Sequence, residues 1–283
     1  MREKIWRVGD RRFDVSRHAL IMGVLNVTPD SFSDGGEFFT PHQAIERGVV
    51  MAAEGAHIID VGGESTRPGS EPIAAEEELR RVIPVIEKLR QKIDLPISID
   101  TSKAEVARAA IEAGASIVND VTGGRADERM LPLIANTKSA FIIMHMHGTP
   151  RTMQIQPRYT DVVAEISDFF RQQYARAIGL NIDPMVTAFD PGTGFRHTLE
   201  RNSRVLAPLK RIRGPARPLV AGLPCQPFLQ KLIGSPEITD RLVAGVAMTA
   251  ILRGRGGDVF RVHDVKENVY ALQVAEAVLQ GAK

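Results

Sequence analysis

Short apolar segments rich in β-branched residues alternate with longer amphipathic segments along the whole chain. Eight apolar segments occur, at residues 19–27, 56–62, 95–101, 115–121, 140–146, 185–192, 217–223 and 257–264. Continuous apolar segments of this length are typical of parallel strands that are covered on both faces. Apolar residues recur at helical spacing in the segments between them, for example in residues 40–56, 102–115, 161–180 and 264–282. The pattern therefore predicts eight strand–helix repeats.

Eight such repeats predict a closed (β/α)8 barrel, a TIM barrel of the α/β class, rather than an open sheet. No linker of biased composition divides the chain, so we expect a single domain over residues 1–283. Residues 1–18 are predicted to form a hairpin that closes the bottom of the barrel. Two Gly-rich connections, after the first and second strands, are longer than the typical βα loop of about 2–6 residues. Long loops on this face of a barrel usually serve function.

Composition restricts the class of partner. The chain has 36 Lys and Arg against 34 Asp and Glu, a formal net charge of +2. This balance favours neither nucleic acid nor a membrane surface as the partner. The single cysteine cannot form an intramolecular disulfide, and residues 1–15 lack the apolar core of a signal peptide. We therefore expect a cytoplasmic protein that acts on small molecules.

Polar residues stand at or near the ends of the predicted strands. They are Asn26, Asp60, Asp100, Asn119, His145 with His147, Asp190, the run Pro224-Cys225-Gln226, and Arg261 with His263. Barrel enzymes build their active sites at the carboxyl ends of the strands, and polar groups there are costly to bury unless they are paired. Any one of these residues is equally well explained as a cap or a satisfied core group. The whole array predicts an active site.

The array divides by chemistry into two halves. Asp100, Asn119 and Asp190 suit the edge of a flat, amine-bearing heterocycle, because an aspartate accepts paired hydrogen bonds from a ring N–H and an exocyclic amine. The other half offers amide, hydroxyl and cationic groups, which suit a phosphate or diphosphate. Its members are Asn26, Thr66, Arg67, Arg261 and His263.

Two cofactors can be weighed from the same residues. His145 and His147 beside Asp60 and Asp190 are zinc ligands by type. A Mg²⁺ ion that bridges a phosphate and one protein oxygen is the better interpretation, because Mg²⁺ commonly keeps water and substrate phosphates as ligands. The Gly-rich segment at residues 190–195 lacks the G-x-G-x-x-G spacing of a dinucleotide site, so NAD is not expected.

Six segments resemble the dihydropteroate synthase family of pterin-binding barrels. "MGVLNVTPDSFSDGG" (residues 22–36) and "DVGGESTRPGS" (residues 60–70) resemble its two loop signatures. "ISIDTSKAEVARAAIEAGASIVNDVTG", "MHMHGTPRTMQ", "FDPGTGF" and "FRVHDVKE" follow in the family's order. The resemblance implies a homodimer that condenses dihydropterin-methyl diphosphate with p-aminobenzoate in folate biosynthesis. Diphosphate would leave first, and the arylamine would attack the resulting methylene cation.

The resemblance also implies a role for individual residues. The pterin would be held by Asp100, Asn119 and Asp190, with Met144, Gly222 and Gln226 as further substrate-binding positions. The diphosphate would be bound by Thr66, Arg67, Arg261 and His263, and Asn26 would hold Mg²⁺ against it. The p-aminobenzoate ring would pack against Pro68 and Phe195. Catalysis would depend most on Asp100, Asp190, Arg261 and His263.

One corner departs from the family. Members carry a Ser-Arg-Lys run after strand seven, where this chain has Pro224, Cys225 and Gln226. Proline offers neither a hydroxyl nor an N–H, and Gln226 donates hydrogen bonds without a charge. After strand six, Arg196-His197 replaces a Gly-Lys pair, and Arg196 faces either the mouth of the site or solvent. Cys225 has no assured base partner to activate it, so a structural role is the simpler interpretation.

Three functions remain open from the sequence. The first is a dihydropteroate synthase with a rebuilt p-aminobenzoate site, less sensitive to the sulfonamides that mimic this acceptor. The second is a related transferase that uses another nucleophile, and the third is a non-catalytic pterin-binding protein. The changes are confined to one corner while both loop signatures are intact, which argues against loss of function. The first is favoured, because the chemistry depends most on departure of the leaving group.

Overall fold

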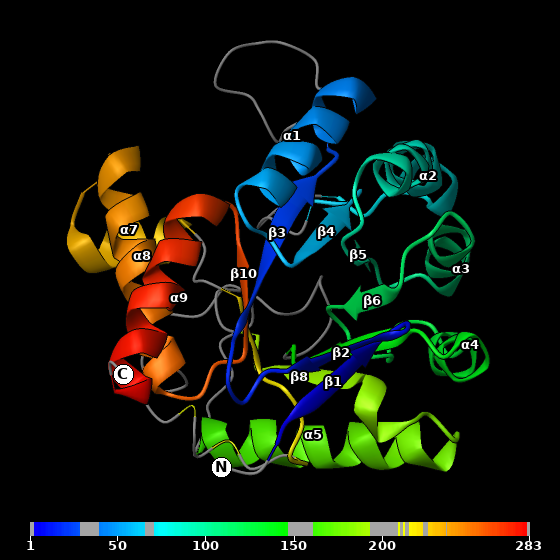
Figure 1. Ribbon diagram of the computed structural model, residues 1–283. Coiled ribbons are helices and arrows are strands. Elements are labelled where there is room, and N and C mark those ends of the chain that lie inside the picture. Colours follow the sequence, from blue (N-terminus) through cyan, green and yellow to red (C-terminus); the bar gives the residue numbers. More distant parts are fainter. Residues whose placement is uncertain are drawn as a thin grey trace.

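A parallel eight-stranded sheet forms the centre of the molecule (Figure 1). The computed structural model describes residues 3–28, 40–65, 71–146, 161–192, 209, 212, 215–222, 226–235 and 237–281. The strands are β3 (Leu20–Asn26), β4 (Ile58–Gly62), β5 (Ile97–Asp100), β6 (Ile117–Asp120), β7 (Ala140–Met144), β8 (Thr187–Asp190), β9 (Val220–Gly222) and β10 (Val259–Val262). A parallel bridge between Phe189 and Leu219 joins β8 to the β9 segment and closes the barrel. The predicted TIM barrel is confirmed.

Helices surround the sheet, as Figure 1 shows. They are α1 (Pro41–Ala53), α2 (Ala75–Lys92), α3 (Ala104–Glu112), α4 (Met130–Thr137), α5 (Val162–Gly179), α7 (Gln226–Ile233), α8 (Ile238–Gly254) and α9 (Val265–Gln280), with a 3₁₀ turn η1 (Pro184–Val186). Local sequence sets their ends. Thr40 and Gln43 form a capping box at the start of α1, and Gly114, at φ +113°, follows the end of α3. No helix in these ranges is long and apolar enough to cross a membrane.

The N-terminal segment forms the predicted hairpin. Strand β1 (Ile5–Val8) pairs antiparallel with β2 (Arg11–Asp14). Trp6 is completely buried, and its Nε1 donates a hydrogen bond of 3.0 Å to the carbonyl oxygen of Val186. Because Val186 directly precedes β8, the hairpin lies at the amino end of the barrel, opposite the strand ends where the polar residues gather.

The pairing register separates inward from outward side chains. Residues paired across strands point to the same face, as do residues two apart on one strand. Gly23 faces outward: a Cβ there would lie 3.0 Å from Met51 Sδ of α1 and 3.1 Å from Val265 of α9. Gly62 faces inward, because a Cβ there would lie 3.6 Å from Asn26 Oδ1 and 3.7 Å from Asp100 Cβ. The polar strand-end residues that share the parity of Gly62 are therefore directed into the barrel.

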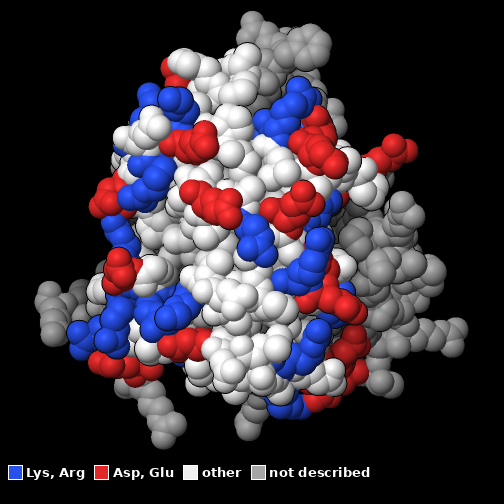
Figure 2. Space-filling view, turned by 90° about the vertical axis from the view of Figure 1, so that its right-hand side faces the viewer, with Lys and Arg blue, Asp and Glu red and all other residues white. Residues whose placement is uncertain are grey.

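The outer face over α2, α3 and α4 has mixed charge. Figure 2 views this side and shows acidic and basic side chains interspersed, with no large area of one sign. Several are ion-paired, including Arg80 and Arg81 with Glu77, and Arg129 with Asp127. This is a solvated surface of the kind that gives no electrostatic attraction for a polyanion.

Candidate active site at the carboxyl ends of the strands

A single row of side chains crosses four neighbouring strands near their carboxyl ends. Asn26 pairs with Gly62, Gly62 with Asp100, and Asp100 with Asn119. All four positions point into the barrel, and glycine at the second leaves open space between Asn26 and Asp100. Strand pairing therefore brings together an amide, a carboxylate and a second amide that the sequence separates by up to 93 positions (119 − 26).

Arg261 lies inside this polar group. Its Nε donates a hydrogen bond of 2.6 Å to Asp60 Oδ2, and its second terminal nitrogen forms an ion pair with Asp100 Oδ2. Asn119 Nδ2 also donates to Asp60 Oδ2, over 3.2 Å. Arg261 pairs with Met22 and Gly222 in the register, so its long side chain extends from a row nearer the middle of the barrel. The separation predicted between an acidic ring half and a cationic anion half is not seen here, because Arg261 contacts the acids directly.

Asp60 is the residue that sequence reasoning undervalued. It stands among the predicted strand-end residues, but only the fold reveals that its side chain is completely buried and accepts from both Arg261 and Asn119. Asp60 precedes Gly62 by two positions, so both face the same way in a strand, but the sequence alone does not say that this direction is inward.

Charge in the cluster is unbalanced. Asp60, Asp100 and Asp190 all interact with the guanidinium of Arg261, which cannot neutralise three carboxylates. Burial raises the pKa of Asp100 to about 7; Arg261 opposes this shift, and Asp60 and Glu78 add to it. Burial works against the charge of Arg261, but Asp60 and Asp100 outweigh it and raise the pKa of the guanidinium. Arg261 is therefore a permanent cation, and the raised pKa values of Asp100 and Asp190 mean that these two acids hold a proton more readily than usual.

Asp190 ends β8 two residues beyond Ala188, which lies in the row of Asn119. It pairs with Met144 of β7, and its Oδ1 accepts a hydrogen bond of 2.7 Å from the N–H of Gly192. Gly192 has φ +72°, and a Cβ there would lie 2.2 Å from the carbonyl oxygen of His145, so only glycine fits this turn. Burial raises the pKa of Asp190 to about 7, although the Gly192 N–H and Arg261 lower it. The turn thus holds a carboxylate in the barrel mouth.

His145 does not belong to this site. It follows the inward-facing Met144, and its ring lies against α5, with its centroid 5.0 Å from that of Phe169. Its Nε2 is 3.7 Å from Glu165 Oε1. The prediction that His145 shares the rim with the aspartates is wrong, because strand alternation turns it to the outside of the barrel.

A magnesium site at Asn26 is compatible with the donor set. Asn26 Oδ1 and Asp100 Oδ2 would lie 3.6 and 4.0 Å from a Cβ at Gly62, so two oxygen atoms border the space that the glycine leaves open. Oxygen ligands are the kind that Mg²⁺ prefers, with phosphate and water completing the shell. Among the described residues, no group of three or more His, Cys, Asp or Glu is arranged to hold a metal ion. That finding concerns protein-built sites and does not bear on an ion held by one amide and a substrate.

The remaining predicted positions lie at the edge of the described residues or outside them. His263 follows β10 with an exposed side chain, and its carbonyl oxygen accepts from Arg47 over 3.2 Å. Gly222 ends β9 beside Arg261. Gln226 begins α7, but its side chain is not described. Thr66, Arg67, Pro68, His147, Phe195, Arg196, His197, Pro224 and Cys225 lie outside the described residues.

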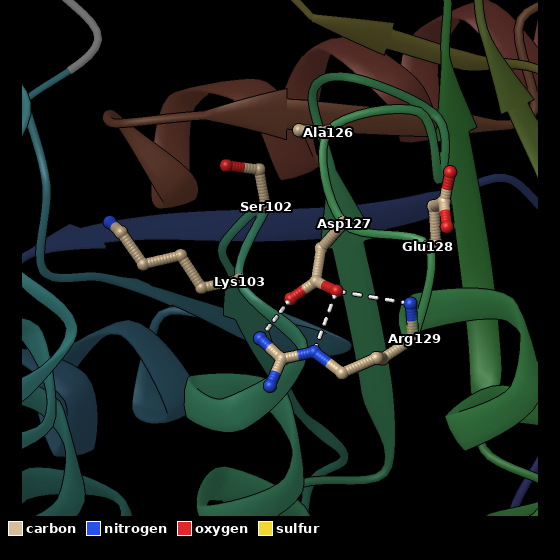
Figure 3. A pocket seen from close by; sticks show the side chains of 6 residues that line it. All are labelled: Ser102, Lys103, Ala126, Asp127, Glu128 and Arg129. Atoms are coloured by element: carbon tan, nitrogen blue, oxygen red, sulfur yellow. Dashed lines mark hydrogen bonds and ion pairs between the residues drawn. The ribbon is translucent and has the colours of Figure 1, made fainter.

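A cavity of about 530 Å³ opens farther out on the rim, between the loops that follow β5 and β6 (Figure 3). It is lined by Ser102, Lys103, Ala126, Asp127, Glu128 and Arg129. Asp127 accepts two hydrogen bonds of 2.9 Å from the Arg129 guanidinium, which lowers its pKa to about 2, and it caps the N–H of Ala104 at the start of α3. Asp127 is engaged in joining the two loops, and the cavity includes no member of the Asp60 cluster.

Known proteins resemble the chain over almost its full length. A family model described as pterin binding enzyme matches residues 22–263. The chain is 42% identical to dihydropteroate synthase of Synechocystis sp. over 271 residues, which cover 96% of this chain and 94% of the relative. The structure of Xanthomonas albilineans dihydropteroate synthase with 4-aminobenzoic acid matches with a TM-score of 0.90 and 40% identity, over 99% of this chain and 100% of that chain. A sulfonamide drug complex of the Yersinia pestis enzyme matches with a TM-score of 0.91 and 38% identity, over 98% and 100%.

Proposed function

The chain belongs to the pterin-binding enzyme family, and we propose that it is a transferase of the dihydropteroate synthase type, active in folate biosynthesis. It condenses dihydropterin-methyl diphosphate with p-aminobenzoate and releases diphosphate. The observation that carries the proposal is the inward row of Asp100 and Asn119, with Asp190 beside it and Arg261 among them. The two aspartates and the asparagine suit the nitrogen-rich pterin ring, and the neighbouring Arg261 supplies a permanent positive charge for the diphosphate.

The reaction follows from these groups. Asp100 and Asp190 accept hydrogen bonds from the N–H groups of the pterin, and Asn119 completes the ring contacts. The bond between the methylene carbon and the diphosphate oxygen breaks, and its electron pair leaves with diphosphate. Arg261 and His263 stabilise the departing charge, which is usually the largest contribution to catalysis of this kind. The arylamine nitrogen then bonds to the methylene carbon and loses a proton to solvent.

Mg²⁺ is the proposed cofactor. Asn26 Oδ1 would hold the ion, which would supply positive charge to the diphosphate oxygens. The oxygen atoms that border Gly62 support this assignment. Thr66 and Arg67 are proposed to complete the anion site, and Pro68 and Phe195 to pack against the acceptor ring, on the resemblance of their segments to the family signatures.

The acceptor site is proposed to be altered. On the resemblance to the family, Pro224, Cys225 and Gln226 replace a Ser-Arg-Lys run, which would leave two donors and two cations missing where an aromatic carboxylate should dock. Charged hydrogen bonds contribute about 1.5–3 kcal/mol each, so the affinity for p-aminobenzoate and for sulfonamides should be reduced. A different acceptor, or pterin binding without catalysis, is the alternative that this corner favours.

A homodimer is proposed as the assembly. Helix α9 exposes Tyr270, Val274 and Val278 at four-residue spacing, with exposed fractions of 55%, 65% and 76%. Val243 of the adjacent α8 is 68% exposed. Exposed apolar residues that repeat along one face of a helix are more often part of an interface than of open surface. A cytoplasmic location is proposed on the composition alone.

One assay separates the three functions. Purified protein with Mg²⁺ and dihydropterin-methyl diphosphate is expected to release diphosphate faster when p-aminobenzoate is added. Release at the same rate without p-aminobenzoate would support another acceptor or hydrolysis. Pterin binding without release would support a non-catalytic protein, and loss of both binding and release would overturn the proposal.

A further inference from the structure

Asp60 is the junction of the polar cluster. Its Oδ2 accepts from Arg261 Nε at 2.6 Å and from Asn119 Nδ2 at 3.2 Å. The side chain is completely buried, and its Oδ1 has no hydrogen-bond partner among the described residues. Burying a carboxylate with one unpaired oxygen is costly, and the ion pair with Arg261 offsets part of that cost.

The contact between Asp60 and Arg261 lowers the affinity that Arg261 can offer to an anion. Asp60 accepts a hydrogen bond from Nε of Arg261, and Asp100 accepts one from a terminal nitrogen of the same guanidinium. A diphosphate that needs Arg261 must therefore compete with two carboxylates that are already bound to it. Asp100 is also a proposed ring ligand and is engaged when pterin is bound, whereas Asp60 lies deeper, paired across the sheet with Ser98.

We propose, on the premise of the proposed function, that Asp60 is a positioning residue. Its hydrogen bond to Nε restrains the side chain of Arg261 and lowers the affinity of Arg261 for diphosphate. The restraint keeps the guanidinium extended toward Asp100 and prevents it from holding the leaving group too tightly after the reaction. Binding that is equally strong in the ground state and the transition state does not accelerate a reaction. Diphosphate is the released product, so a lower affinity for free diphosphate favours turnover.

The test is Asp60→Asn, which is nearly isosteric. The amide oxygen can keep both hydrogen bonds while the NH₂ group takes the place of Oδ1, so the geometry is retained and the charge is lost. The affinity for inorganic diphosphate, measured by calorimetry without pterin, is expected to rise about tenfold, the equivalent of one charged hydrogen bond. Inhibition of turnover by added diphosphate should strengthen by a similar factor, and kcat should not rise. Damage to the fold would weaken binding instead.

A charge-matched control separates the contact from general electrostatics. Asp127→Asn removes one acid from the same rim, but Asp127 pairs with Arg129 and not with Arg261. This variant should bind diphosphate as the wild-type protein does. An equal rise in both variants, or no rise in Asp60→Asn, would overturn the inference. If wild-type protein binds neither pterin nor diphosphate, the proposed function fails instead.

A second measurement needs no variant at Asp60. In wild-type protein labelled with ¹⁵N-arginine, the Nε–H resonance of Arg261, assigned by comparison with Arg261→Lys, should exchange slowly with solvent and shift when inorganic diphosphate is added. Rapid exchange in the substrate-free protein would show that Asp60 does not restrain Arg261, and the inference would be wrong.

Discussion

Asp100 and Asn119 are direct partners across the β5–β6 ladder, so both side chains enter the barrel at the same level. The direction of each side chain is set by its strand and not by the residue itself. The alternation of β5 and β6, together with the register, turns both toward the axis. Asp190 reaches the same space from β8, where it pairs with Met144. A ring placed among these three residues meets two carboxylates and one amide.

Asp190→Asn should abolish tight pterin binding. A carboxylate accepts paired, charge-assisted hydrogen bonds from an N–H and an amine, whereas the amide offers one acceptor and no charge. We expect pterin affinity to fall by about 10- to 100-fold, from the loss of about 1.5–3 kcal/mol. Calorimetric titration of wild type and variant with pterin measures this, and a melting temperature no lower than that of wild type excludes unfolding as the cause. Equal affinities would remove Asp190 from the ring site.

The same substitution should change how stability depends on pH. The pKa of Asp190 is raised from 3.8 to about 7 in the folded protein, so between these values the folded state binds a proton that the unfolded state releases. This group therefore stabilises the fold below the window and loses that contribution as pH rises through it. Asparagine does not titrate. Urea unfolding at about pH 5 and about pH 8 should show Asp190→Asn gaining stability relative to wild type at the higher pH, and a constant difference would contradict the raised pKa.

The alternation of apolar and amphipathic segments was enough to predict the barrel. Each of the eight predicted segments contains an observed strand that is shorter than the segment, because edge residues of an apolar segment lie beyond the last ladder hydrogen bond. The polar strand-end residues were predicted as a set, but their partners were not. Contact between Arg261 and Asp60 depends on the register of β10 against β3 and of β3 against β4, which no local pattern encodes. The outward turn of His145 was missed because the sequence alone does not say which parity faces the axis.

Trp6 should stabilise the barrel without affecting its chemistry. Trp6→Ala removes a completely buried indole and its hydrogen bond to Val186, and we expect the free energy of unfolding to fall by about 3–5 kcal/mol. Trp6→Phe keeps most of the apolar contact and should lose about 1–3 kcal/mol. Denaturant titration followed by circular dichroism measures both. The rate of diphosphate release per folded molecule should remain that of wild type, because the hairpin lies at the opposite end of the barrel; a large drop in Trp6→Phe would contradict this separation.

The apolar stripe of α9 should be the dimer contact. Val278→Glu places a charge on a side chain that is 76% exposed in the single chain, so the fold should tolerate it while an interface should not. Light scattering is expected to report a dimer for wild type and a monomer for the variant at micromolar concentration. Glu112→Gln on α3 changes charge at a distant helix and should leave the dimer intact. A wild-type monomer, or a dimer that survives Val278→Glu, would exclude this surface.

The corner after β9 gives the sharpest test of the acceptor. Replacing Pro224-Cys225-Gln226 by Ser-Arg-Lys introduces a hydroxyl and two cations, each able to contribute about 1.5–3 kcal/mol to a bound carboxylate. If the corner limits the reaction with p-aminobenzoate, the KM for this acceptor should fall by at least about tenfold, and inhibition by a sulfonamide should strengthen in parallel. Pterin affinity is the internal control for the ring site, and it should not fall in the variant. An unchanged KM with normal pterin affinity would mean that other residues already bind the acceptor carboxylate. If both wild type and variant require a different amine for turnover, residues 224–226 are suited to another acceptor and do not weaken a p-aminobenzoate site. Cations alone cannot create activity toward an acceptor that the rest of the site rejects.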